Sequence, residues 1–203
     1  MSSRDEILAS IRANLPRVDR PLPPVPLFDD HPPAALLAAF KESLERMGGL
    51  FLDPPASGDP LAPIRERVAN VKIVCSTVPE IRGNRDIARI GAPQELADVD
   101  LAIVRASFAV AETGSVLLTA RDLHVNAVAY LAQHLIVLLD PADIVVNLHH
   151  AYRRPEFRDG HYAAFHTGPS ATADIEGVLI HGAQGVRSLF VLPVSKAESR
   201  PTP

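Results

Sequence analysis

Hydrophobic positions in the second half of the chain form short apolar runs separated by segments with helical spacing. Apolar runs of strand length occur at 101–104, 107–111, 116–119, 135–139 and 189–192. Short runs of this kind are typical of buried strands. Over 123–131 and 141–148, apolar residues recur at helical spacing instead. Strands that alternate with helices and are apolar on both faces predict an α/β domain whose open, mostly parallel sheet is covered by helices.

The first hundred residues carry weaker patterns. Apolar residues at helical spacing predict a helix over 34–47, ended by the glycine pair at 48–49. A shorter helix over 64–69 leads into a strand at 71–75. Segment 79–93 is mixed in character and predicts no single element.

The N-terminus has a pattern of its own. Ser3 and Glu6 match a capping box at a helix start. The residues that follow form one apolar stripe, made of Ile7, Leu8, Ile11 and Leu15. This stripe packs either on its own domain or on a partner, which includes another copy of the chain in a homo-oligomer. Both alternatives stay open.

Prolines then dominate the connector that reaches residue 33. Proline fixes φ and lacks a donor, which favours an extended connector or an ordered strap over the surface. We therefore expect an N-terminal helix and proline-rich connector at 1–33, an α/β domain at 34–195 and a flexible tail at 196–203.

Composition and charge narrow the class of protein. The net charge of −4, with no basic stripe, argues against nucleic acid as a partner. Cys75 is the only cysteine, so the chain cannot supply the four thiolates that an iron–sulfur cluster usually needs. We expect a buried thiol there. The N-terminus does not resemble a secretory signal, and the apolar runs are too short to span a bilayer, which predicts a cytoplasmic protein with no membrane span.

The most distinctive stretch of the chain is 167–176. A strand over 162–167 leads into a Gly-Pro turn, and the spacing of Ile175, Val178 and Leu179 predicts a helix behind it. The start of a helix leaves backbone N–H groups free, and these favour a phosphate or carboxylate. The alternative is that the hydroxyl residues only cap the helix and the acids only complement its dipole. Candidate ligand-binding residues are Gly168, Pro169, Ser170, Thr172, Asp174 and Glu176.

A second turn joins the apolar runs at 107–111 and 116–119. Glu112 could act there as a general base, a covalent nucleophile or a hydrogen-bond acceptor, and is the candidate catalytic residue. Thr113, Gly114 and Ser115 complete the candidate ligand-binding set. The alternative is a tight turn with a solvated Glu112. Because ligands of open α/β sheets lie beyond the carboxyl ends of strands, we expect the two turns to converge on one cleft.

Histidines suggest a competing metal site. His149, His150, His161 and His166 are close in sequence, with Asp159 among them. Their spacing does not match a His-Glu-x-x-His helix, so no metal site is predicted. Glycine-rich nucleotide-binding loops are also missing from the sequence.

At the two turns the chain resembles the lactate utilization protein C family, also called LUD-domain proteins. The resemblance rests on 111–115, on 168–176 and on Gly182 and Gly185, and it covers roughly residues 98–192. The family usually has a histidine where this chain has Gln184. The resemblance implies a fold like that of the ribose-phosphate isomerase, glucosamine-phosphate deaminase and CoA-transferase group.

The resemblance also implies a function. Members of the family act beside two iron–sulfur proteins in the oxidation of L-lactate to pyruvate. We therefore expect a subunit that binds a small carboxylate or phosphate, carries no cofactor itself and works with iron–sulfur partners. One alternative is a self-sufficient enzyme of the CoA-transferase or sugar-phosphate isomerase type that uses Glu112. Another is a non-catalytic binding or scaffold domain, to which the change at Gln184 points.

Overall fold

The computed structural model describes residues 2–16, 21, 23–159, 162–175, 178–181 and 185–196. Its helices are α1 (Ser3–Asn14), α2 (Leu36–Arg46), α3 (Ala62–Val68), α4 (Ala120–Leu123), α5 (Val128–Leu131), α6 (Leu148–Ala151) and α7 (Glu156–Asp159). Short 3-10 segments are η1 (Ile87–Arg89), η2 (Pro93–Leu96) and η3 (Pro141–Asp143). The strands are β1 (Leu50–Phe51), β2 (Val74–Ser76), β3 (Leu101–Arg105), β4 (Phe108–Val110), β5 (Ser115–Thr119), β6 (His134–Leu139), β7 (Ile144–Val145), β8 (Ala163–His166), β9 (Ala171–Ile175), β10 (Val178–His181) and β11 (Ser188–Pro193).

Five of these strands form the central sheet, in the order β1-β11-β6-β3-β2. Every neighbouring pair in it is parallel. The wholly apolar runs in β3 and β6 lie at its centre, where both faces are covered. The predicted α/β fold with a mostly parallel sheet is confirmed.

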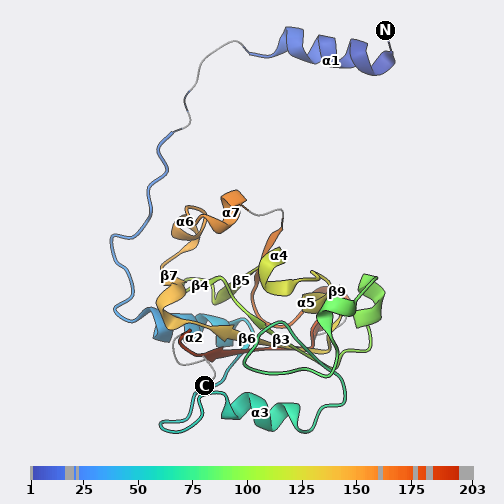
Figure 1. Ribbon diagram of the computed structural model, residues 1–203. Helices are drawn as coiled ribbons and strands as arrows, with labels where there is room; N and C mark the ends of the chain where they lie inside the picture. Colours follow the sequence, from blue (N-terminus) through green and yellow to red (C-terminus); the bar gives the residue numbers. More distant parts are fainter. Residues whose placement is uncertain are drawn as a thin grey trace.

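Successive side chains of the central strands point to opposite faces and pack into two separate cores. Ile103, Ile136 and Leu138 pack in one core with Ile64 of α3. Ala102, Val104, Leu135 and Val137 lie in the other core with Phe40 and Leu44 of α2. Figure 1 shows α3 beneath the central sheet and the smaller sheet above it.

The smaller sheet has the order β7-β4-β5-β8, and two of its strands directly follow strands of the central sheet along the chain. β3 continues into β4, and β6 leads through η3 into β7, which pairs with β4 in parallel. β5 pairs with β4 and β8 in antiparallel fashion. As a result, the turn between β4 and β5 and the turn after β8 lie at the same end of this smaller sheet.

Three predicted helices are wrong. Segment 123–131 forms the separate helices α4 and α5, with His124 between them at φ 59°. Over 141–148 the chain forms η3, β7 and the start of α6, because the β-branched Ile144 and Val145 pair with β4. Behind Gly168 it forms β9, which pairs with β10 in antiparallel fashion.

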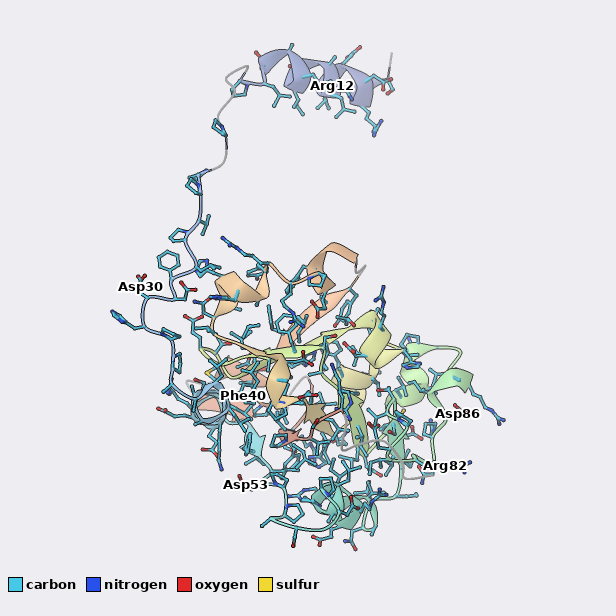
Figure 2. All side chains as sticks on the ribbon, turned by 60° about the vertical axis from the view of Figure 1, so that its left-hand side comes forward. Arg12, Asp30, Phe40, Asp53, Arg82 and Asp86 are labelled. Atoms are coloured by element: carbon cyan, nitrogen blue, oxygen red, sulfur yellow. The ribbon has the colours of Figure 1, made fainter. Side chains whose placement is uncertain are left out.

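The N-terminal helix α1 starts from a capping box one residue earlier than predicted. Ser2 accepts a hydrogen bond from the backbone N–H of Asp5, whose side chain accepts in return. Ile7 and Ile11 of its apolar stripe are each more than half exposed. Figure 2 shows Arg12 of α1 well away from Phe40 in the body of the molecule. Across the described residues, the structure shows no helix of the length and apolar character that a bilayer requires.

Candidate functional site

The two turns do come together. The Ser115 hydroxyl oxygen lies 2.5 Å from that of Thr167 and 2.7 Å from that of Thr113. Ser115 itself is 4% exposed. A chain of three hydroxyl groups therefore ties the turn after β4 to the end of β8.

The glycines of both turns face the C-terminal end of α2. Gly114 has φ +68°, and a Cβ atom on it would lie 2.2 Å from the backbone nitrogen of Leu44. Gly168 has φ +82°, and a Cβ atom there would lie 2.3 Å from the carbonyl oxygen of Met47. Both positions require glycine for its left-handed backbone and for the close approach of the helix. On this side α2 packs directly against the backbone of both glycines.

Glu112 has a structural partner. Its side chain is exposed, and its Oε2 atom accepts a hydrogen bond of 3.2 Å from the backbone N–H of Leu148. Its carbonyl oxygen accepts a hydrogen bond of 3.2 Å from the hydroxyl of Ser43 in α2. Glu112 thus links the turn to both α2 and the first residue of α6.

The Gly-Pro-Ser turn leads into a hairpin instead of a helix. The backbone N–H of Ser170 donates a hydrogen bond of 2.9 Å to the carbonyl of Val186. A Cβ atom on Gly185 would lie 2.9 Å from the Cβ of Ser170, so the two segments are in close contact. Pro169 is half-buried beside them. The helix start that was expected to attract an anion does not exist here.

The remaining candidates lie along this hairpin. Thr172 and Asp174 are residues of β9. Glu176, Gln184 and Gly182 lie outside the described residues.

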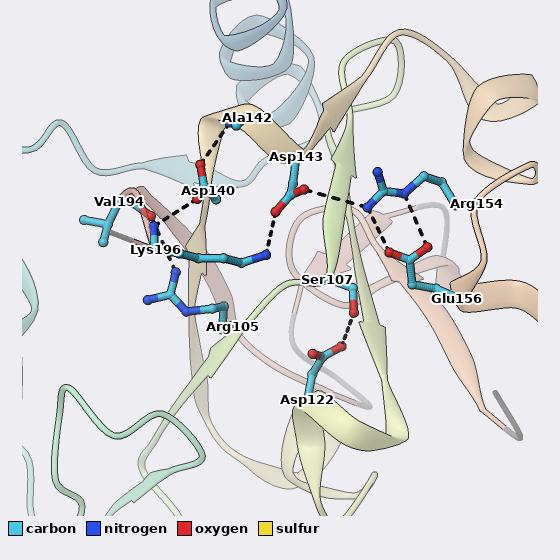
Figure 3. Close-up of polar contacts among 10 residues, drawn as sticks. All are labelled: Arg105, Ser107, Asp122, Asp140, Ala142, Asp143, Arg154, Glu156, Val194 and Lys196. Atoms are coloured by element: carbon cyan, nitrogen blue, oxygen red, sulfur yellow. Dashed lines mark hydrogen bonds and ion pairs between the residues drawn. The ribbon is translucent and has the colours of Figure 1, made fainter. Parts of the chain in front are cut away.

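The carboxyl edge of the central sheet carries a buried ion pair that the sequence did not single out. Arg105, the last residue of β3, donates from Nη2 to Oε1 of Glu80 at 2.6 Å. The two side chains are 17% and 7% exposed. The other oxygen of Glu80, Oε2, is buried without a hydrogen-bond partner. Arg105 also donates to the carbonyl of Val194 at 3.5 Å (Figure 3).

A second set of charges clamps the ends of β6 and β11. Asp140 follows β6 and accepts a hydrogen bond of 2.9 Å from the backbone N–H of Lys196. That hydrogen bond is the largest cause of the lowered pKa of Asp140. Lys196 Nζ lies 2.6 Å from Asp143, which also faces Arg154 at 3.7 Å (Figure 3). This network stabilises the carboxyl ends of both strands.

Asp122 organises the junction between the two sheets. Its Oδ2 atom accepts from the Ser107 hydroxyl at 2.6 Å (Figure 3). The same atom accepts from the backbone N–H and hydroxyl of Thr119 at 2.8 and 2.7 Å. Thr119 and Asp122 form a capping box at the start of α4. The Thr-x-x-Asp spacing in the sequence is the signal that could have revealed it.

A hollow of about 770 Å³ opens at the carboxyl end of β2, beside Ser76. Arg82, Arg85 and Arg89 line it, against the single carboxylate of Asp86. Arg85 is held by Asp98 at 2.6 Å, and Arg89 lies 3.3 Å from Asp86. Figure 2 shows Arg82 and Asp86 on the same side of the molecule. We call this feature the arginine hollow; it falls in segment 79–93, where the sequence pattern was mixed.

The histidines are dispersed over different environments. In the described part of the chain, no group of three or more His, Cys, Asp or Glu residues could hold a metal ion. His161 lies outside the described residues. His166 sits on β8 with its Nε2 atom buried and unpartnered, 5.2 Å between ring centres from Tyr130. Burial lowers the pKa of the His166 ring to about 4, so it is neutral at physiological pH.

Comparison with known proteins identifies the family of this chain. The chain is similar in fold to a crystal structure described as a DUF162 family protein from Deinococcus radiodurans, with 18% sequence identity and a TM-score of 0.60. That match covers 85% of this chain and 100% of the other. A family model, the LUD domain, matches residues 67–194. The chain therefore belongs to the LUD-domain family, as the resemblance indicated. No curated protein matches its sequence.

Proposed function

We propose that this chain is a non-redox subunit of an assembly that oxidises L-lactate to pyruvate beside iron–sulfur partner proteins. The observation that carries the proposal is its membership of the LUD-domain family, which is associated with lactate utilization. Cys75, its one cysteine, is 0% exposed, and burial raises the pKa of its thiol to about 11. A single buried thiol cannot hold a four-cysteine cluster. The two electrons that lactate releases would pass to clusters on the partners.

We place the small anionic ligand of this subunit in the arginine hollow. Arg82, Arg85 and Arg89 line it. Arg85 is paired with Asp98 and Arg89 with Asp86, so Arg82 supplies the positive charge that these ion pairs leave over, although the whole chain has a net charge of −4. Arginine forks bind carboxylates in bidentate fashion. The hollow also begins at Ser76, the last residue of β2, which is where α/β sheets usually hold ligands. The Glu112 turn is less suitable, because it presents a carboxylate and α2 packs against its glycine.

A self-sufficient transferase or isomerase that uses Glu112 is the second candidate. The exposure of its carboxylate at the carboxyl end of β4 favours this candidate. Catalysis through Glu112 requires that Glu112→Ala abolishes acyl or proton transfer by the purified chain. Activity that survives this substitution would eliminate the mechanism.

Co-purification tests the lactate proposal directly. The tagged chain, isolated from its native host grown on L-lactate, is expected to bring down proteins that carry iron–sulfur clusters, seen by their visible absorption. Deletion of the gene is expected to abolish growth on L-lactate and to spare growth on succinate. Unimpaired growth on L-lactate, together with recovery of no iron–sulfur protein, would refute the proposal.

A further inference from the structure

The amino edge of the central sheet, where its parallel strands begin, carries two adjoining hollows. The larger has a volume of about 600 Å³ and lies where the chain enters β2, β3, β6 and β11. The smaller, of about 380 Å³, lies beside the end of α3. Three residues line both hollows: Asn70, Val71 and His134. We call the combined space the amino-edge groove.

The larger hollow carries cationic side chains that are free to meet a ligand. Lys72 precedes β2 and Arg187 precedes β11, and both are exposed. No ion pair joins either side chain to another described residue. Of the two acids in the lining, Asp98 is neutralised by Arg85 at 2.6 Å, and Asp100 accepts a hydrogen bond of 2.9 Å from a backbone N–H. Two free cations therefore face one carboxylate, which favours an anion.

His134 stands between the two hollows. Its Nδ1 atom lies 2.7 Å from the hydroxyl oxygen of Ser188, which fixes the orientation of the ring. When this hydroxyl donates to Nδ1, the neutral ring carries its proton on Nε2. The Nε2–H group is then a donor for an anion held by Lys72 and Arg187, which line the same hollow.

The smaller hollow is mainly apolar. Leu101 and Phe190 form part of its wall, and both pack in the core on the α3 side of the sheet. The guanidinium of Arg67 lies 5.0 Å from the centre of the Phe190 ring. Glu66 at the rim is exposed. Because guanidinium groups stack on flat rings, this hollow suits an aromatic group better than a flexible aliphatic chain.

We propose that the amino-edge groove is a binding site for a small aromatic carboxylate. The carboxylate lies in the larger hollow with Lys72 and Arg187, since a guanidinium fork holds a carboxylate in bidentate fashion. The ring lies in the smaller hollow with Arg67 and Phe190. Charge and ring are thus recognised by separate parts of one groove.

This site is distinct from the arginine hollow. The groove is lined by 70–72, before β2, whereas the arginine hollow begins at Ser76, the last residue of that strand. The inference therefore goes beyond the proposed function and does not depend on it. A ligand at either place leaves the other open.

Benzoate is the probe that tests the groove. It is titrated into the isotopically labelled full chain, and the amide shifts are followed by NMR. We expect shifts in 70–72 and 187–190 and none in 82–89. Acetate, which lacks the ring, and benzyl alcohol, which lacks the charge, should each bind at least about fivefold more weakly.

Matched variants separate the two halves of the groove. Arg187→Gln should weaken benzoate binding about tenfold, through the loss of one charge-assisted hydrogen bond. Arg46→Gln, at another exposed arginine, should bind benzoate like the parent. Phe190→Leu should weaken benzoate about threefold and leave acetate unchanged. Circular dichroism checks that each variant keeps the parent fold.

Several results would overturn the proposal. They are the absence of shifts in 70–72 and 187–190, equal affinity for benzyl alcohol and benzoate, and unchanged benzoate affinity in Arg187→Gln. Shifts confined to 82–89 that vanish in Arg82→Gln would place benzoate in the arginine hollow and would also overturn it. Because the probe is benzoate, failure of the chain to bind L-lactate leaves this result unaffected.

Discussion

Gly114→Ala is the sharpest test of how the turn after β4 is used. The new Cβ atom would lie 2.2 Å from the backbone nitrogen and 2.6 Å from the Cα of Leu44, and helix backbone cannot rotate away as a flexible side chain can. The positive φ of +68° adds its own strain. We estimate about 1–2 kcal/mol for the left-handed backbone and about 1–3 kcal/mol for the overlap, together about 2–5 kcal/mol of unfolding free energy.

Urea denaturation followed by circular dichroism measures this loss, and Gly58→Ala provides the matched control. Gly58 also has a positive φ, +94°, but nothing lies within 4 Å of the position that an alanine methyl group would take there. It should therefore show only the backbone cost, about 1–2 kcal/mol. Equal losses for the two variants would show that α2 does not press on the turn. The turn would then have room for a ligand, and our interpretation of the site would be wrong.

Three further predictions probe other parts of the account. Asp122→Ala removes the acceptor of three hydrogen bonds and should cost about 2–3 kcal/mol in urea denaturation, against less than about 0.5 kcal/mol for the exposed Glu42→Ala. Burial lowers the pKa of His166 to about 4, so the unfolded chain binds more protons than the folded chain between pH 4 and 6.5. The free energy of unfolding should therefore rise with pH in that window by up to about 1.4 kcal/mol per pH unit. His166→Gln should flatten this rise, whereas His31→Gln should leave it unchanged. Cys75 should react with a thiol reagent at pH 8 only after unfolding, and rapid reaction of the native chain would contradict its burial.

The strands of the central sheet were predictable because their sequence signal is unambiguous. A run such as Leu135 to Leu139 is apolar at every position, and a run of this length that includes β-branched residues is typical of a strand covered on both faces. The helix predicted behind Gly168 failed for a different reason. Ile175 and Val178 fit a helical spacing, but they pair directly across the β9–β10 hairpin, and a local pattern cannot reveal that partner.

The candidate site was predictable only in part. The prediction that the two turns come together was correct, as the contact between Ser115 and Thr167 shows. The sequence could not show that α2 lies over Gly114 and Gly168, because that contact joins segments far apart in the chain. The contact between the proline-rich connector and Asn147 was equally hidden, since Asn147 and Leu27 are 120 positions apart. The role of Glu112 and the other turn residues in binding or catalysis stays a prediction.

Titration of the purified chain with L-lactate tests the central claim that an anion binds at the arginine hollow and not at the turn of Glu112. Isothermal titration calorimetry on the parent, Arg82→Gln and Glu112→Gln chains measures the affinity. We predict that Arg82→Gln weakens binding about tenfold, which corresponds to about 1.4 kcal/mol, and that Glu112→Gln leaves it unchanged. Loss of affinity in Glu112→Gln with full affinity in Arg82→Gln, or no binding by the parent, would contradict the account.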